Sequence, residues 1–114
     1  MLNKQTKSIY FQKLPQIVRL LKEGYHPEKI ILFGSMLSAD KDSRDIDLFL
    51  IKKTDEPRIG KRLLTASRYL PDAETPIDIL VFTPREVDRE IARGNVFISE
   101  ILEKGRVLYN QDEN

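Results

Sequence analysis

The chain has 114 residues, of which 40% are hydrophobic and 32% are charged, and its formal net charge is +1. This length suits a single domain with one core, and the composition is that of a globular protein with a well-solvated surface. Because the net charge is close to zero, no whole-molecule field draws the chain toward nucleic acid or a membrane, and an anionic ligand has to be held locally.

The sequence carries no recognisable membrane or export signal. It has no run of 18 apolar residues, its first residues lack the apolar core of a signal peptide, and it contains no cysteine. We therefore expect a cytoplasmic protein whose single domain covers residues 1–114. Its core is expected over about 14–109, with a polar, disordered tail over 110–114.

In chain order, the first predicted element is a helix. Its apolar residues recur at helical spacing, namely Tyr10, Leu14, Ile17, Val18 and Leu21. Pro15 marks either its start or a kink, because proline lacks the N–H that a helix interior needs, and Gly24 marks its end. The lone histidine, His26, falls in the loop that follows, where we expect a solvated side chain without a role.

The remaining elements alternate between strands and helices. Strands are predicted over 29–33, 48–51, 77–82 and 106–109, and helices over 59–69, 84–92 and 96–104. Thr83, Pro84 and Glu86 form a capping-box start, and Asn95 caps the last helix. This order predicts an α/β (α+β) sandwich with helices packed on a small mixed sheet. The first two strands are expected to be antiparallel neighbours because their connection is short, and the last strand is expected at an edge.

The stretch from Ile30 to Ile51 carries the candidate chemistry. Its first strand ends at Gly34-Ser35, where glycine permits a close ligand approach and the start of a short helix over 36–39 would hold phosphate oxygens. Asp45 and Asp47 open the next strand on one face, with Cα atoms about 6.5–7 Å apart. Because adjacent carboxylates repel unless a cation lies between them, this pair predicts a site for Mg²⁺, or for Mn²⁺ as the alternative.

A third carboxylate, Asp78, stands near the start of the third strand. Three aspartates at strand starts beside a phosphate cradle are typical of two-metal phosphoryl transfer, in which ions about 3.5–4 Å apart clamp the attacking and leaving oxygens. Each piece alone has a plain explanation: a turn for Gly34-Ser35, solvated charge for Asp45 and Asp47, and a buried hydrogen-bond acceptor or a surface residue for Asp78. Their order and their attachment to predicted strands favour the catalytic interpretation.

Together these residues resemble the minimal nucleotidyltransferases of the DNA polymerase β superfamily. In that family an apolar strand leads to Gly-Ser, a spacer leads to Asp-x-Asp, and a later strand carries a further Asp. The matching segments here are IILFGS at 30–35, DID at 45–47 and PIDILV at 76–81, and the stretch at 97–109 is similar to the family's closing helix and strand. The resemblance spans roughly residues 27–109.

The resemblance implies a nucleotidyltransferase fold, a reaction and a set of roles. Gly34 and Ser35 would hold the β- and γ-phosphates of ATP or another nucleoside triphosphate. Asp45 and Asp47 would bind both Mg²⁺ ions, and Asp78 would complete the site on the nucleophile's side. A nucleoside monophosphate, expected to be AMP, would move to a hydroxyl acceptor with release of pyrophosphate.

The resemblance also implies a partner. Stand-alone chains of this size are similar to the antitoxin half of toxin–antitoxin pairs, whose other half is a separately encoded helical protein of the HEPN class, often a ribonuclease. In such pairs the nucleotidyltransferase can adenylylate its partner and silence it. We therefore expect a HEPN-type partner and an antitoxin role, while the formation of homo-oligomers stays open.

The loop after Gly34-Ser35 departs from the family pattern. The family commonly has Arg, a small residue and Gly there, and Ser before the first Asp of Asp-x-Asp. The corresponding residues here are Met36, Leu37, Ala39 and Arg44. Because the missing Arg removes a fixed fork for phosphate, an alternative stays open: a catalytically weak or inactive module of the same fold that neutralises its partner by contact alone.

Other surfaces give weaker signals. Direct nucleic-acid binding is not expected, because no basic stripe with interleaved aromatic residues appears. Lys52-Lys53 and residues 58–62 are interpreted as solvated faces. Phe97 and Ile98 on the last helix are candidates for partner contact, with core packing as the expected use of at least one of them.

Overall fold

A mixed four-stranded sheet organises the molecule. The computed structural model describes residues 2–34, 46–70 and 76–113, and within these ranges the side chains from residue 12 onward. The sheet order is β3-β2-β1-β4, with β1 at Lys29–Phe33, β2 at Ile46–Ile51, β3 at Ile77–Phe82 and β4 at Arg106–Asn110. β1 pairs antiparallel with β2 and β4, whereas β2 and β3 are parallel. The prediction of antiparallel first strands and of an edge strand at the C-terminal end is confirmed.

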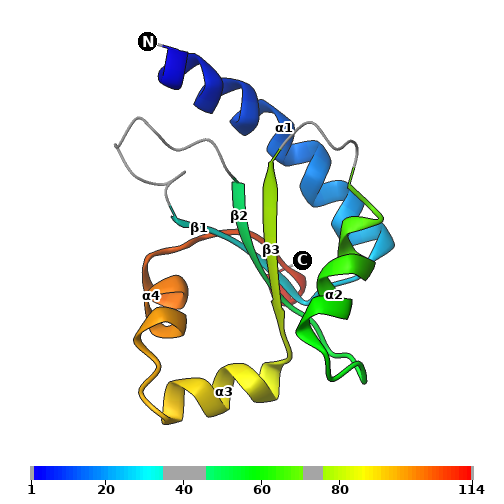
Figure 1. Ribbon diagram of the computed structural model, residues 1–114, viewed down its shortest axis with the longest axis vertical. Coiled ribbons are helices and arrows are strands. Elements are labelled where there is room, and N and C mark those ends of the chain that lie inside the picture. Colours follow the sequence, from blue (N-terminus) through cyan, green and yellow to red (C-terminus); the bar gives the residue numbers. More distant parts are fainter. Residues whose placement is uncertain (1, 35–45, 71–75, 114) are drawn as a thin grey trace.

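Helices cover both faces of this sheet (Figure 1). Their bounds are Leu2–Gly24 for α1, Ile59–Ser67 for α2, Pro84–Ala92 for α3 and Val96–Lys104 for α4. α1 and α2 pack on one face, where Leu14, Ile17 and Ala66 join the larger buried cluster. α3 and α4 pack on the opposite face through Val87, Ile98 and Ile101. The predicted α/β sandwich is therefore confirmed.

The alternation of side chains along the strands separates these two cores. In β2 the even-numbered residues Ile46, Leu48 and Leu50 belong to the cluster under α1 and α2, whereas Phe49 belongs to the cluster under α3 and α4. Successive strand residues point to opposite faces, and both faces are covered here, so the strand reads as a nearly continuous apolar run. The same alternation places Asp47 on the face of Phe49.

Both predicted helix caps are present. The Thr83 hydroxyl accepts a hydrogen bond from Glu86 N–H at 3.1 Å, and the Glu86 carboxylate accepts one from Thr83 N–H at 2.8 Å. This reciprocal pair is the capping box that the sequence indicates. Asn95 Oδ1 accepts from Ile98 N–H at 3.2 Å and starts α4. Because these caps use residues close in sequence, they fix α3 and α4 locally.

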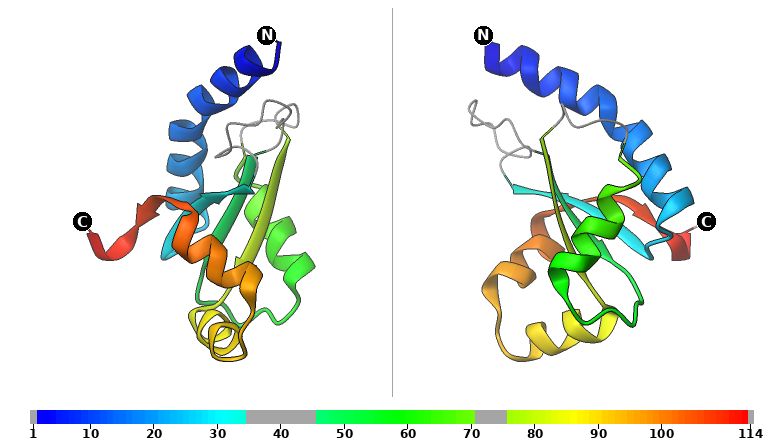
Figure 2. Two further views of the ribbon diagram at one scale, coloured as in Figure 1. Left: turned by 90° about the vertical axis from the view of Figure 1, so that its left-hand side faces the viewer. Right: turned by 45° about the vertical axis from the view of Figure 1, so that its right-hand side comes forward.

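The structure decides one open alternative and corrects one expectation at the two ends of the chain. α1 runs through Pro15, which excludes a helix start at that residue, and its N-terminal turns extend past the starts of β2 and β3 (Figure 1, Figure 2). The tail predicted to be disordered continues as a 3-10 helix over Gln111–Glu113. Gln111 N–H donates to Glu28 O at 2.9 Å, and Asp112 N–H donates to Asn110 Oδ1 at 3.1 Å. These bonds hold a segment whose polar composition suggested disorder.

One charged residue that the sequence places on a solvated face is buried. Arg62 is 3% exposed, and its side chain extends from α2 to the end of β3 and the start of α3. Its guanidinium donates to two backbone carbonyls and to the Glu86 carboxylate, so partners distant in sequence compensate its desolvation. The solvated-face interpretation of residues 58–62 is therefore wrong for Arg62.

Among the helices that the structure describes, none is long and apolar enough to cross a membrane.

Candidate active site

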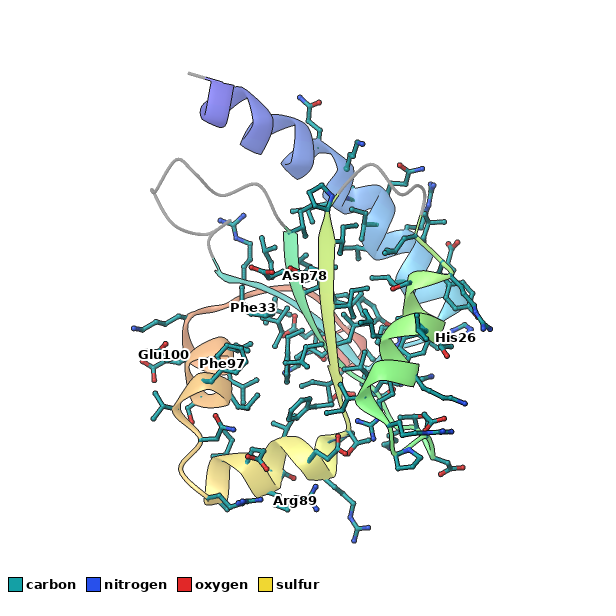
Figure 3. The ribbon with its side chains drawn as sticks, in the orientation of Figure 1. His26, Phe33, Asp78, Arg89, Phe97 and Glu100 are labelled. Atoms are coloured by element: carbon teal, nitrogen blue, oxygen red, sulfur yellow. The ribbon has the colours of Figure 1, made fainter. Side chains whose placement is uncertain are left out.

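Two of the three predicted catalytic aspartates lie side by side. In the parallel ladder between β2 and β3, Asp47 is the register partner of Asp78. Both occupy the starting ends of their strands, and both point to the face on which α3 and α4 pack, since Phe49 and Phe82 continue the same alternation there. Figure 3 shows Asp78 near the start of β3, at the edge away from α3. The structure thus brings these two carboxylates together.

The surroundings of this pair suit a hard cation. Neighbouring strands lie about 4.7–4.9 Å apart, so two in-register carboxylates repel each other unless positive charge is near them. Asp78 is exposed and Asp47 is half-buried, so one side of the pair is open to a ligand. Carboxylate oxygens are the donors that Mg²⁺ prefers. The residues therefore fit Mg²⁺, and the role of metal ligand stays a prediction for both.

Gly34 packs directly against the Asp47 carboxylate. Its φ is +79°, a backbone conformation that favours glycine, and a Cβ at this position would collide with Asp47 Oδ2. Gly34 directly follows Phe33, the antiparallel register partner of Asp47. The glycine that the sequence assigns to phosphate binding therefore also sets the space in which the Asp47 carboxylate lies.

We expect Gly34→Ala to damage the site more than the fold. The positive φ costs an alanine about 1–2 kcal/mol in unfolding free energy, and the new Cβ has to displace the Asp47 carboxylate. A shift of about 1 Å in a catalytic group can reduce turnover about 100-fold. Urea denaturation measures the first effect, and nucleotide transfer measures the second.

Gly94→Ala is the matched control for that substitution. Gly94 has nearly the same φ, +80°, but nothing lies within 4 Å of a Cβ placed there. The Gly94→Ala variant should lose a similar amount of unfolding free energy and keep the transfer rate of the unchanged protein. Equal transfer by the two variants would show that the contact between Gly34 and Asp47 has no catalytic consequence.

Several predicted site residues cannot be placed. Ser35, Asp45 and the predicted short helix over 36–39 lie outside the described residues, as does Arg44. Within the described ranges no group of three His, Cys, Asp or Glu side chains is arranged to hold a metal ion. The described part of the chain contains two of the three predicted aspartates, Asp47 and Asp78, together with Gly34.

A pocket that the sequence did not indicate adjoins Gly34. It measures about 450 Å³ and lies between the end of β1 and α4. The described residues that line it are Phe33, Gly34, Phe97, Glu100, Ile101, Lys104 and Gly105. Of the two helix residues that were candidates for partner contact, Phe97 is 53% exposed, whereas Ile98 is buried in the core, the use expected for at least one of them. The signal for this pocket in the sequence was Phe33, the bulky aromatic residue before Gly34-Ser35. A phenylalanine at that position is equally typical of a core residue.

The mixed sheet with helices on both faces matches a nucleotidyltransferase fold. The family model described as "Polymerase beta, Nucleotidyltransferase" matches residues 15–114. The chain therefore belongs to the polymerase β nucleotidyltransferase family, whose general reaction is the transfer of a nucleoside monophosphate.

A solved structure supports the fold independently. The crystal structure of a protein from Sulfolobus solfataricus, provisionally assigned as a nucleotidyltransferase, is similar with a TM-score of 0.67. The similarity covers 98% of this chain and 90% of that chain at 17% sequence identity, a level that shows the fold alone. No curated protein matches the chain.

Proposed function

We propose that this protein is a Mg²⁺-dependent nucleotidyltransferase that moves AMP from ATP to a hydroxyl group on a separate helical protein of the HEPN class, and so acts as its antitoxin. The observation that carries the catalytic part is the in-register pair of Asp47 and Asp78 beside Gly34. Family membership supports monophosphate transfer. The choice of ATP, the partner and the antitoxin role rest on the resemblance of the motifs to the nucleotidyltransferases of such pairs.

Each residue in this proposal has a defined task. Gly34, followed by Ser35, binds the β- and γ-phosphates through a backbone that no side chain obstructs. Asp47 and Asp45 would hold Mg²⁺ together, and Asp78 would complete the side of the site that faces the acceptor. When bound, Mg²⁺ neutralises charge on the phosphate oxygens and on the attacking and leaving oxygens.

The reaction balances without a further reagent. The acceptor oxygen attacks the α-phosphorus, a new P–O bond forms, and the bond to the β-phosphate oxygen breaks to release pyrophosphate. The exposed carboxylate of Asp78 takes the hydroxyl proton as the attack proceeds. The products are the AMP-bearing acceptor and pyrophosphate.

The test is incubation of the protein with its HEPN-type partner, ATP and Mg²⁺, read by the intact mass of both chains. We expect the partner to gain the mass of one AMP unit and the nucleotidyltransferase to stay unmodified. Parallel reactions with GTP, CTP and UTP test the choice of base, because each would add a different mass. Omission of Mg²⁺ should prevent the gain.

Two outcomes would contradict the proposal in different ways. A complex that forms and neutralises the partner without any mass change would favour the contact-only module. Transfer of AMP to a small hydroxyl compound, with the partner unmodified, would keep the enzyme but replace its acceptor.

A further inference from the structure

A row of side chains joins the acidic pair to an aromatic pair. Register pairing places Asp78 beside Asp47, and Asp47 opposite Phe33, across β3, β2 and β1. Side chains of directly opposite residues share a face. Phe97 of α4 then meets Phe33 edge to face, with ring centroids 5.9 Å apart and an interplanar angle of 84°. In Figure 3 the labelled Phe33 lies between Asp78 and Phe97.

The aromatic end of this row is a pocket and not part of the closed core. Phe97 keeps 53% of its surface exposed although its ring touches Phe33. Ile101 lies deeper, in the core cluster. The pocket of about 450 Å³ therefore has an apolar floor and an aromatic wall that remains accessible.

The rim of the pocket carries one acceptor and one donor. Glu100 and Lys104 both line it, and their charged groups lie 3.7 Å apart one turn from each other on α4. Both side chains are mostly exposed, so the ion pair itself adds little stability. A ligand whose edge has a donor next to an acceptor can bond to both groups.

Gly34 connects the two ends of the row. It packs against the Asp47 carboxylate and also lines the aromatic pocket. A molecule that occupies both places has to present phosphate oxygens to the acidic end and a flat ring with a polar edge to the aromatic end. A nucleotide has both in one molecule.

We propose that this pocket receives the base of the nucleoside triphosphate, stacked on the exposed face of Phe97, with a purine preferred for its larger stacking area. The proposal rests on the proposed function, because it assigns the base subsite of the same nucleotide. Glu100 accepts from an amino or imino group of the base edge, and Lys104 donates to a neighbouring nitrogen or oxygen.

The chain offers a direct probe because it contains no tryptophan. Phe97→Trp introduces a single indole at the pocket wall, where stacking is kept. With Mg²⁺ present, its emission should change on addition of ATP and stay constant on addition of inorganic tripolyphosphate, which has no base. Val96→Trp is the control, since Val96 is 69% exposed and does not line the pocket; its emission should stay constant with both compounds.

Affinity supplies the second measurement. Stacking of one base on an aromatic side chain is lost in Phe97→Ala, so ATP should bind about tenfold more weakly or worse. Tripolyphosphate should bind as it does to the unchanged protein. Leu102→Ala is the matched control on the same helix, because Leu102 is also exposed but does not line the pocket, and it should leave both affinities unchanged.

The outcomes separate this inference from the proposed function. If the unchanged protein binds ATP and Phe97→Ala binds it equally well, the base assignment is overturned and the nucleotidyltransferase function stands. A Phe97→Ala protein that binds ATP normally but no longer transfers AMP would also overturn the base assignment, and would assign the pocket to the acceptor. If the unchanged protein binds neither ATP nor tripolyphosphate in the presence of Mg²⁺, the proposed function itself fails, and the base subsite with it.

Discussion

Asp47→Asn is expected to reduce nucleotide transfer about a thousandfold or more while the fold stays intact. Asparagine has nearly the same shape as aspartate but no charge, so it binds a hard cation poorly and leaves the phosphate charge less compensated. A metal ion contributes several kcal/mol to such a transition state, and each 1.36 kcal/mol is a factor of about ten in rate. The rate of AMP transfer to the partner measures the loss.

The same substitution should leave the protein folded. Asparagine keeps the size of aspartate and one acceptor oxygen, so urea denaturation should still show a cooperative transition. Adding Mg²⁺ should then raise the melting temperature of the unchanged protein, because a ligand that binds only the folded state stabilises it. Asp47→Asn should lose most of that rise.

Asp88→Asn is the control for both measurements. Asp88 is exposed on α3, at the other end of β3 from the acidic pair (Figure 1), so its variant should transfer AMP normally and respond to Mg²⁺ normally. An Asp47→Asn protein that transfers AMP at the unchanged rate would show that this carboxylate has no part in the chemistry. The role assigned to Asp78 would then have to be reconsidered as well.

The elements that sequence analysis predicted well are those set by short-range signals. The capping box of Thr83 and Glu86 and the Asn95 cap depend on residues three positions apart. The alternation of β2 and β3 decides which face each side chain takes. That is why the sequence predicted the strands, α3 and α4, and also placed Asp47 and Asp78 at strand starts.

The features that sequence analysis missed depend on contacts across the fold. The pocket beside Gly34 exists because α4 returns to β1 and sets Phe97 against Phe33, which is 64 residues earlier in the numbering. No local pattern distinguishes such a phenylalanine from a core residue. Arg62 was assigned to a solvated face because it lies in a charged stretch over 58–62. Its burial depends on acceptors contributed by β3 and α3.

Arg62 also gives the largest stability effect that we expect. Its guanidinium donates to Glu56 O at 2.7 Å, to Val81 O at 3.1 Å, and through two nitrogens to the Glu86 carboxylate at 2.7 and 3.1 Å. Breaking a buried pair of this kind by removing one partner costs about 3–5 kcal/mol. Arg62→Met, which keeps most of the side-chain volume, should therefore lose about that much unfolding free energy.

Arg58→Met is the control for a surface ion pair. The Arg58 side chain is 65% exposed and pairs with Glu56 at 3.1 Å, and such pairs contribute about 0–1 kcal/mol. Urea denaturation of both variants measures the difference. A loss in Arg62→Met no larger than that in Arg58→Met would mean that the buried guanidinium contributes no net stability.

The difference in unfolding free energy between the unchanged protein and Arg62→Met should depend on pH, and this dependence tests the role of the Glu86 carboxylate. The hydrogen bond from Arg62 holds the pKa of Glu86 below its ordinary value. Burial opposes this bond less strongly, and the bond from Thr83 N–H lowers the pKa by a still smaller amount. A lowered folded-state pKa gives stability that is present above the unfolded value, about 4.3, and is lost as pH falls through the folded value. The difference in unfolding free energy between the unchanged protein and Arg62→Met should therefore shrink as pH falls below about 4.

The consequence extends beyond stability, because Glu86 has two functions. The same carboxylate that pairs with Arg62 also closes the capping box at the start of α3, and Arg62 donates to the carbonyl of Val81 near the end of β3. Loss of the guanidinium therefore loosens the junction between β3 and α3.

Asp78 lies at the opposite end of β3, where register pairing with β2 holds it independently. At a temperature where Arg62→Met is still folded, its transfer rate should thus stay within about twofold of the unchanged rate, which is about 0.4 kcal/mol. A much larger loss of transfer in the folded variant would show that the junction also positions the acidic pair.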